Sequence, residues 1–293
     1  MKATGAELHH RAETLAAPLP PLMVAAKRVA STVAQGVHGR RRVGQGETFW
    51  QFRRYQQDDS ITRIDWRRSA KSSHLYVRET EWEAAQSVWL WRDASASMDY
   101  ASMPAFGSKR LRAELLLLAL GVLLVRGGER IAVLGSNLRP SSGRIVLTRI
   151  AHMLEEGEPA TPSLPVPEAL PRHARVVLIG DFLSPLAEIK ATLAAFDALG
   201  VRGHMVQVLD PAEETLPFAG RVRFVGPEAE GVALIGRAET AAGDYARAMA
   251  AHQAEIGRYT RSAGWSFVRH RTDRPPETAV LALYLGLAEP ALE

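Results

Sequence analysis

The chain has 293 residues, of which 46% are hydrophobic, and it contains no cysteine. The absence of cysteine excludes disulfide scaffolds, thiolate zinc sites and cysteine nucleophiles. Lysine and arginine number 36 against 32 aspartates and glutamates, and this net charge of +4 is too small to indicate nucleic-acid binding by itself. A chain of this size buries a full core, either as one large α/β domain or as one domain with a smaller appendage.

No segment has the pattern of a membrane span or a signal peptide. The longest uninterrupted apolar run covers residues 115–125, whereas a span needs roughly 18 residues or more. Residues 1–11 contain charged and histidine side chains and lack a continuous apolar stretch. We therefore expect a cytoplasmic protein.

Three regions differ in composition. Residues 1–36 are alanine-rich and are predicted to form a helical appendage, which Pro18, Pro20 and Pro21 break into two pieces. Residues 37–86 carry several glycines and most of the excess positive charge, and they are predicted to form a basic, β-rich subdomain. Residues 87–293 are predicted to form an α/β domain.

Short apolar strands alternate with helical patterns from residue 87 onward. In chain order, strands are expected at residues 87–91, 130–135, 175–180, 203–208, 222–225 and 265–269. Helices are expected at residues 111–126, 145–155, 186–199, 240–262 and 278–287. This alternation predicts a doubly wound, mostly parallel sheet with helices on both faces. The proline-rich stretch at residues 156–171 is predicted to be a surface loop.

Oxygen-bearing side chains follow two of the expected strands. The strand at residues 87–91 is followed by Asp93, Ser95 and Ser97, and the strand at residues 175–180 runs into Asp181. In a doubly wound sheet, ligands bind at the carboxyl ends of the strands, where the strand order reverses. Two carboxylates and two hydroxyls that converge there could bind one hard cation such as Mg²⁺.

These residues also carry a family resemblance. Asp93, Ser95, Ser97, Met98 and Asp181 resemble the metal-ion-dependent adhesion site of von Willebrand factor A domains. Three further segments resemble the domain-of-unknown-function 58 family: residues 52–59, with the sequence FRRYQQDD, residues 61–79, and residues 210–220, which begin DPAEE. The resemblance spans roughly residues 39–287, and its specificity comes from the combination of residues 58–66 with residues 93–98.

The resemblance implies a von Willebrand factor A-like fold and a metal-dependent binding module that is not an enzyme. In the adhesion site, Ser95 and Ser97 would ligate Mg²⁺, or Mn²⁺ or Ca²⁺, directly. Asp93 and Asp181 would act largely through water, and an Asp or Glu of a partner would fill the open coordination position. Few anionic ligands leave the ion electrophilic, which favours such an incoming carboxylate.

The family pattern also has a threonine from a third loop, and this sequence shows no clear counterpart. Ser141 and Ser142 lie in about the right region, whereas Thr148 falls inside an expected helix. Loss of this ligand would weaken the hold on the ion.

Members of the family are commonly encoded beside MoxR-type AAA+ ATPases. The resemblance therefore implies a partner or adaptor of such an ATPase in a chaperone-like or metal-insertion system. Many relatives carry membrane helices before the characteristic block. Short N-terminal helices are expected in that place here, so the chain resembles the soluble variety.

Other interpretations of the same residues compete with metal binding. Asp93, Ser95 and Ser97 are suited to capping the turn that follows them, and Asp181 to capping the helix after Ser184.

The basic segment between residues 38 and 78 could bind phosphate or nucleic acid. However, Asp58, Asp59 and Asp65 lie among its arginines and favour internal ion pairs. Its aromatic side chains could stack on bases, but their spacing favours packing of the subdomain onto the main sheet. They are Trp50, Phe52, Tyr55 and Trp66.

The enzymatic alternative is a Mg²⁺-dependent phosphotransferase in which Asp93 attacks phosphorus. Such enzymes usually carry a second acid two residues later, where this chain has Ser95, and a downstream lysine, for which Lys190 lies too deep in its expected helix. No zinc-protease, P-loop, nucleophile-elbow or dinucleotide-binding motif occurs. We therefore do not expect the protein to hydrolyse ATP.

Overall fold

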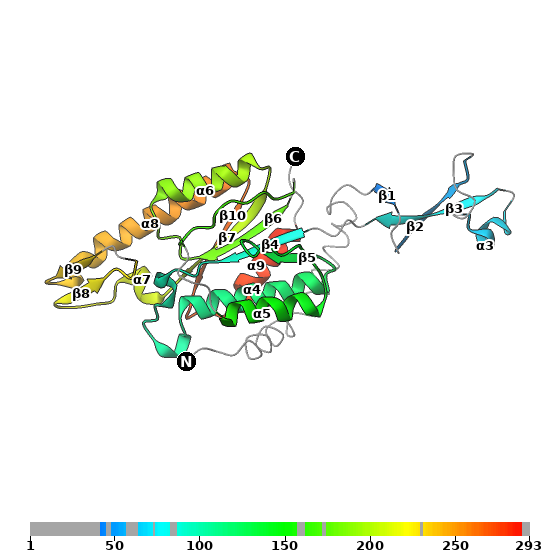
Figure 1. Cartoon of the computed structure of the whole chain (residues 1–293). Helices are drawn as coiled ribbons and strands as arrows, with labels where there is room; N and C mark the ends of the chain where they lie inside the picture. The colour runs from blue at the N-terminus through cyan, green and yellow to red at the C-terminus, as the bar shows by residue number, and fades with distance from the viewer. Residues whose placement is uncertain are drawn as a thin grey trace. The chain divides into compact units, whose positions relative to one another are not determined.

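The computed structural model describes residues 42–44, 48–56, 64–72, 74–82, 87–156, 162–171, 174–228 and 231–288. These residues form two compact units, a small one within residues 42–82 and a large one within residues 87–287. The elements of both are labelled in Figure 1. The helical appendage predicted at residues 1–36 lies outside the described residues.

The small unit is a three-stranded antiparallel sheet with one short helix. Its elements are β1 (Arg42–Gly44), β2 (Thr48–Arg54), α3 (Trp66–Ser69) and β3 (Tyr76–Trp82), and the strand order is β1-β3-β2. Asp65 caps α3, because its Oδ1 accepts a hydrogen bond from the backbone N of Arg68 at 2.8 Å. The guanidinium of Arg68 lies 5.3 Å from the ring centre of Phe52, so this arginine of the basic segment packs on an aromatic ring of its own unit.

Two details of this unit bear on the interpretation of its aromatic and acidic residues. Within the small unit, 60% of the surface of Trp66 is exposed, so this residue is not part of the unit's own core. Asp58 and Asp59 lie outside the described residues.

The large unit contains a five-stranded parallel sheet with the strand order β10-β7-β6-β4-β5. Its strands are β4 (Ser87–Arg92), β5 (Arg130–Val133), β6 (Arg175–Gly180), β7 (Arg202–Leu209) and β10 (Ser266–Arg271). The chain passes from β4 outward to β5 and then returns to β6 on the other side of β4, so the strand order reverses between β4 and β6. The predicted α/β fold with a parallel sheet is confirmed.

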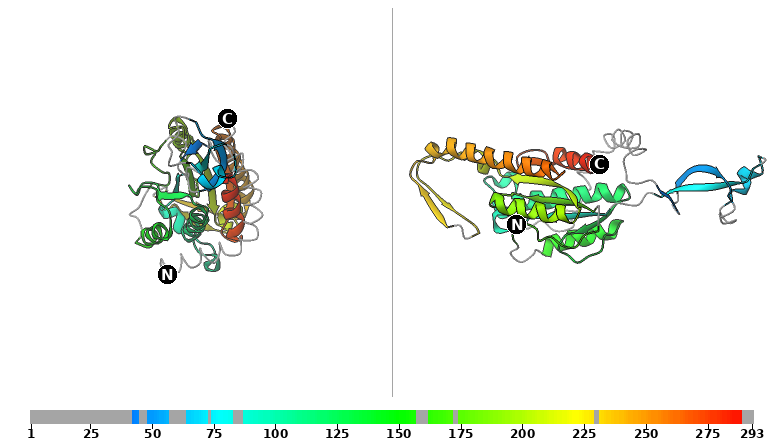
Figure 2. Two further views of the ribbon diagram at one scale, coloured as in Figure 1. Left: turned by 90° about the vertical axis from the view of Figure 1, so that its right-hand side faces the viewer. Right: turned by 90° about the horizontal axis from the view of Figure 1, so that it is seen from above.

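Helices cover both faces of this sheet, as Figures 1 and 2 show. They are α4 (Lys109–Arg126), α5 (Arg144–Glu156), α6 (Leu186–Ala198), α8 (Ala238–Ser262) and α9 (Pro276–Ala288). Side chains alternate along each strand, so Leu90 of β4 packs with α4, α5 and α9, whereas its neighbour Trp89 packs with α6 and α8. The apolar run inside α4 is therefore core, and no helix in the described part of the chain is long and apolar enough to cross a membrane.

A β-hairpin and a short helix depart from the predicted series. The strand expected at residues 222–225 forms as β8 (Val222–Val225), but it pairs antiparallel with β9 (Val232–Ile235) and not with the parallel sheet. The antiparallel pairing has a simple physical reason. Two short strands joined by a turn can pair directly with each other, whereas pairing in a parallel sheet needs a long crossover connection. The helix α7 (Pro211–Thr215) begins at a capping box formed by Asp210 and Glu213.

Two buried histidines make stability depend on pH. Burial lowers the pKa of His204 in β7 and of His270 in β10 to about 4 from 6.5, assisted by Arg175 and Arg112 respectively. The unfolded chain therefore binds more protons than the folded one between pH 6.5 and pH 4, and stability falls as the pH falls through this window. Each histidine contributes at most about 1.4 kcal/mol per pH unit.

Urea unfolding at pH 7 and pH 5 would measure this loss. We expect the His204→Gln, His270→Gln double variant to lose clearly less stability than the wild type between the two pH values. Equal losses in both proteins would show that other groups cause the pH dependence.

Candidate functional site

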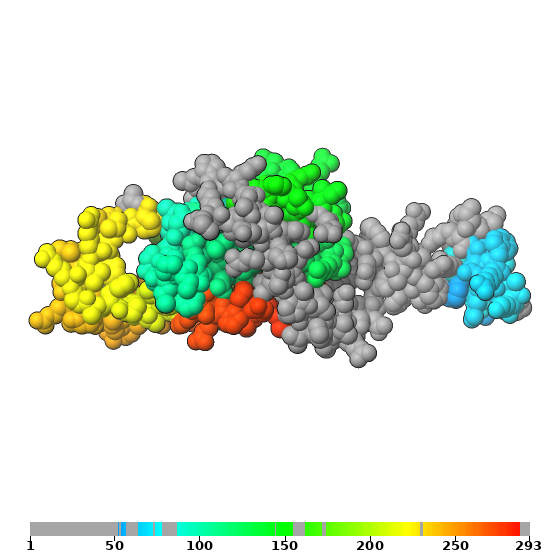
Figure 3. All heavy atoms as spheres, turned by 90° about the horizontal axis from the view of Figure 1, so that it is seen from below, coloured from blue at the N-terminus to red at the C-terminus, as the bar shows by residue number. Residues whose placement is uncertain are grey.

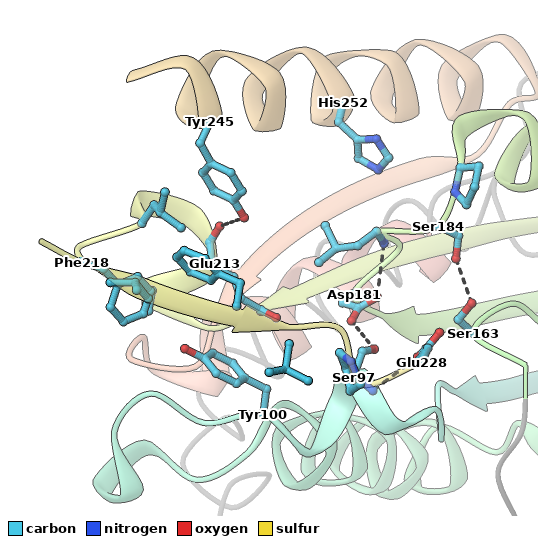
Figure 4. Close-up of a pocket in the computed structure, with 18 of the residues that line it drawn as sticks. Ser97, Tyr100, Ser163, Asp181, Ser184, Glu213, Phe218, Glu228, Tyr245 and His252 are labelled. Atoms are coloured by element: carbon cyan, nitrogen blue, oxygen red, sulfur yellow. Dashed lines mark hydrogen bonds between the residues drawn. The ribbon is translucent and has the colours of Figure 1, made fainter. Parts of the chain in front are cut away.

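The four residues predicted to form a site come together at the carboxyl ends of β4 and β6. A 3₁₀ helix, η2 (Ala96–Asp99), turns the chain after β4 so that Ser97 faces Asp181 at the end of β6. Ser97 Oγ lies 2.6 Å from Asp181 Oδ2 and 3.1 Å from Ser95 Oγ, and Figure 4 shows the first of these contacts. Asp93 Oδ1 accepts a hydrogen bond from the backbone N of Ser95 at 2.8 Å. The site thus lies where the strand order reverses.

Asp93 is the most deeply placed of the four. Its side chain is fully buried, and its Oδ2 has no hydrogen-bond partner among the described residues. Gly180, the last residue of β6, lies directly beside Asp93. A Cβ at position 180 would lie 2.9 Å from Asp93 Cβ, so this close approach needs a glycine. Burial raises the pKa of Asp93 to about 7, and the nearby charges of Asp181 and Glu228 add to the effect.

The capping interpretation describes Asp93 but not the two serines. Asp93 Oδ1 accepts a hydrogen bond from the backbone N of Ser95, which fixes the turn after β4. Ser95 occupies the N-cap position of η2, yet its hydroxyl makes no capping hydrogen bond. The N-cap of α6 is Pro185, so Asp181 does not cap that helix. Asp181 Oδ1 instead accepts a hydrogen bond from the backbone N of Leu183 at 3.2 Å, which fixes the local turn.

The turn after β6 has an unusual backbone. Phe182 is fully buried and has φ of +48°, a left-handed conformation that costs energy for a bulky residue. Two hydrogen bonds hold the turn: Gln207 Nε2 donates to Asp181 O at 2.9 Å, and His252 Nε2 donates to Phe182 O at 2.7 Å. The carboxylate of Asp181 is therefore presented by a rigid segment.

The sequence did not indicate that a lysine enters the site. Lys109 is the first residue of α4, and its side chain is fully buried. Its Nζ lies 2.8 Å from Asp181 Oδ2 and 2.5 Å from Glu213 Oε1. Burial alone lowers the pKa of Lys109, but the two carboxylates outweigh this and raise it above its usual value. The lysine is charged, and it compensates part of the negative charge of the site.

Glu213 could have been found from a local signal, whereas Lys109 could not. The segment Asp210-Pro211-Ala212-Glu213 has the pattern of a capping box, and the structure shows that Glu213 Oε2 accepts from the backbone N of Asp210 at 3.0 Å. The other oxygen of Glu213 is then free to reach Lys109, which lies 104 residues earlier in the chain. No local pattern encodes a contact of that sequence separation.

The hydroxyl from a third loop is not supplied by Ser141 or Ser142. Ser141 pairs with Ile131 near the amino end of β5, whereas the site lies at the carboxyl ends of the strands. A different serine lies at the pocket: Ser163, from the proline-rich stretch, is in hydrogen-bond contact with Ser184 at 2.9 Å, as Figure 4 shows. The described part of that stretch, residues 162–171, contains no helix or strand, in agreement with the predicted loop.

Two of the four residues, Ser97 and Asp181, line a cavity of about 930 Å³, whereas Asp93 and Ser95 are buried behind them. Its walls combine apolar and acidic side chains, among them Tyr100, Leu216, Phe218, Phe224, Tyr245, Asp181, Glu213 and Glu228. Figure 4 shows Tyr245 and His252 projecting from α8 into this space. In the described part of the chain no group of three or more His, Asp or Glu side chains is placed to hold a metal, so a cation here would need the serine hydroxyls as well as carboxylates.

Sequence comparison places the chain in a family. A family model with the description "Protein of unknown function DUF58" matches residues 51–255, more than half of the chain. The chain belongs to the DUF58 family. Uncharacterized protein Rv1480 of Mycobacterium tuberculosis and uncharacterized protein Mb1516 of Mycobacterium bovis are each 31% identical to this DUF58 protein over 278 residues, which cover 89% of this chain and 86% of theirs.

Two solved structures are similar to this DUF58 protein at low sequence identity. One is the conserved hypothetical protein BatB from Bacteroides thetaiotaomicron, with a TM-score of 0.43 and 15% identity over 70% of this chain and 98% of that one. The other is an aerotolerance-related membrane protein from Bacteroides fragilis, with a TM-score of 0.40 and 16% identity over 68% and 96% of the two chains.

Proposed function

We propose that this DUF58 protein is a non-enzymatic interaction module of von Willebrand factor A-like type. It binds an acidic residue of a partner protein through one divalent cation, Mg²⁺ or in its place Mn²⁺ or Ca²⁺. The observation that carries the proposal is the position of Ser97 Oγ, which lies within hydrogen-bond distance of both Ser95 Oγ and Asp181 Oδ2. Hydroxyl and carboxylate oxygens from two strand ends thus meet at one point, which is the donor set that a hard cation prefers.

The balance of charge supports a cation at this point. The carboxylates of Asp181 and Glu213 share the ammonium of Lys109, and Asp93 lies close enough to Asp181 for that charge to raise its pKa. When all three acids are ionised, they outnumber this one lysine by two charges. Asp93 Oδ2, moreover, is buried without a hydrogen-bond partner among the described residues. A buried carboxylate oxygen without a donor is costly, and a divalent ion with its bound water would compensate both the charge and the missing donor.

The proposed partner is a MoxR-type AAA+ ATPase, with the DUF58 protein as its adaptor in a chaperone-like or metal-insertion system. This part of the proposal rests on the family resemblance. The chemistry of the site adds one requirement, namely an Asp or Glu on the partner's surface that can reach the ion. A cytoplasmic location agrees with such a partner and remains a prediction.

Co-purification tests the proposal. The full chain, immobilised, is exposed to the MoxR-type ATPase encoded nearest to its gene, once in Mg²⁺ and once in EDTA. We expect retention in Mg²⁺ only, and loss of retention in the Ser95→Ala, Ser97→Ala double variant, because these substitutions remove both hydroxyl ligands. Ser262→Ala is the matched control, since this exposed serine at the end of α8 lies in no contact with the site. Retention that is equal in EDTA, or equal in the double variant, would contradict the proposal.

Lys109 favours the phosphotransferase alternative in one respect. Such enzymes carry a lysine downstream of the nucleophile, and Lys109 occupies the site that Lys190 cannot reach. However, its ammonium contacts Asp181 and Glu213, and the carboxylate that would have to attack, that of Asp93, has no exposed surface. A nucleophile must reach the reacting atom. Turnover of a generic phosphate ester in Mg²⁺ that Asp93→Asn abolishes would nevertheless favour the enzyme, whereas the interaction module predicts no turnover.

A further inference from the structure

A fourth carboxylate, beside those of Asp93, Asp181 and Glu213, reaches the candidate cation site from a distant part of the chain. Glu228 lies in the turn that follows β8, and its Oε1 accepts a hydrogen bond from the backbone N of Ser97 at 3.3 Å, across 131 residues of sequence. Figure 4 shows Glu228 lying beside Ser97. Figure 3 shows the hairpin, in yellow, alongside the blue-green segment that follows β4. Ser97 is also the residue whose hydroxyl contacts Asp181, so Glu228 lies next to a proposed ligand.

One face of the hairpin that carries Glu228 packs against an aromatic side chain outside the hairpin, and the other face is exposed. In its inner face, the half-buried Phe224 packs edge-on against Phe218 with 5.7 Å between ring centres. Its outer face exposes Val225, Val232 and Leu234, each by more than half of its surface. Residue Glu228 itself is exposed. The contact with Ser97 therefore does not result from burial of the glutamate.

We infer that Glu228 is the protein's own acidic ligand for the cation site, occupying the coordination position that a partner's acid would otherwise take. This inference rests on the proposed function. A divalent ion with an open position binds a carboxylate oxygen, and a carboxylate tethered by the hairpin acts at an effective concentration of about millimolar or more. The acid of a partner must therefore displace Glu228, which lowers the apparent affinity for the partner by the fraction of molecules in which Glu228 is bound.

The substitution Glu228→Gln separates this role from a merely structural contact. The glutamine keeps an amide oxygen that can accept the hydrogen bond from Ser97 N, but it loses the carboxylate. Glu239→Gln is a matched control, because Glu239 also accepts a backbone hydrogen bond, from Gly220 N at 2.7 Å, and lies at the base of the same hairpin. Both variants remove one negative charge from the surface, so any difference between them reports the position of the charge.

Mn²⁺ is the probe, and the readouts are its affinity and the number of waters that it keeps, both measured by water-proton relaxation on the full chain. In Glu228→Gln we expect the Mn²⁺ affinity to fall by about tenfold, the order found when a supporting group of a metal site is lost, and the bound ion to gain one water. Added acetate should then replace that water at lower concentration in Glu228→Gln than in the wild type. Glu239→Gln should behave as the wild type.

The possible results bear differently on Glu228 and on the cation site as a whole. If Mn²⁺ binds all three proteins with the same affinity and hydration, Glu228 is not a ligand, and the cation site stands without it. If Mn²⁺ does not bind the wild type at all, the proposed function and the role of Glu228 both fail.

Discussion

Replacing Lys109 by methionine is expected to destabilise the protein by about 3–5 kcal/mol, the cost of breaking a buried ion pair by removing one partner. The methionine fills most of the volume of the lysine, so the loss comes from Asp181 and Glu213, whose oxygens would remain buried or half-buried without their donor. Urea unfolding in the absence of divalent ions measures the difference. Lys190→Met is the matched control: this lysine is exposed and lies over the ring of Tyr259, so its loss should cost less than about 1 kcal/mol.

The stability of the Lys109→Met variant is also expected to depend on Mg²⁺. If Mg²⁺ and the ammonium both compensate Asp181, Mg²⁺ should restore more stability to Lys109→Met than it adds to the wild type, because a ligand stabilises the state that it binds. The triple variant Lys109→Met, Asp181→Asn, Glu213→Gln should recover part of the loss, since the uncompensated charges are gone. A loss below about 1 kcal/mol in Lys109→Met would show that the buried contacts do not form in solution.

The substitution Asp181→Asn should weaken cation binding by about 10–100-fold, the range for groups that orient a metal site from its outer shell. Asp181 Oδ2 accepts from Ser97 Oγ at 2.6 Å and from Lys109 Nζ at 2.8 Å. An amide NH₂ at that position would face two donors, and an amide oxygen there would carry no charge, so either orientation disrupts the oxygen cluster. Mn²⁺ titration measures the affinity.

Asp99→Asn is the matched control for this experiment. Asp99 lies in η2, close to Ser97 in sequence, but its carboxylate is mostly exposed and pairs with Arg110 at 2.6 Å. Its replacement should leave the cation affinity within about threefold of the wild type, because exposed ion pairs contribute little. Equal affinity in Asp181→Asn and Asp99→Asn would remove Asp181 from the site.

The sequence predicted the parallel sheet and the meeting of Asp93, Ser95, Ser97 and Asp181. Both follow from one rule, since the carboxyl ends of adjacent parallel strands lie at the same edge, and the two strands were recognisable as apolar runs. The pairing of β8 with β9 was not predicted, because strands of four residues are too short to show a clear alternation of apolar and polar residues. Gly226 and Gly231, which flank the turn between the two strands, were the available signal.

Contacts between remote segments were beyond any local pattern. The ammonium of Lys109 sits at the start of a helix whose other residues are mostly apolar, and nothing in its neighbours indicates that it meets Glu213. Ser163 lies in a stretch whose prolines suggested only a loop, and Glu228 in a turn that the sequence did not reveal. Each of these residues reaches the site through tertiary packing. The periodicity of a single sequence indicates helices and strands, but it does not indicate which remote segments come into contact.

In the proposed function, oxygens from the ends of β4 and β6 bind one divalent cation. Titration of Mn²⁺ into the purified full chain, followed by electron paramagnetic resonance, tests it most directly. We predict one bound Mn²⁺ per chain, displaced by Mg²⁺ and absent in the Ser95→Ala, Ser97→Ala double variant, which should remain folded. No bound ion in the wild type, or the same bound ion in the double variant, would contradict the account.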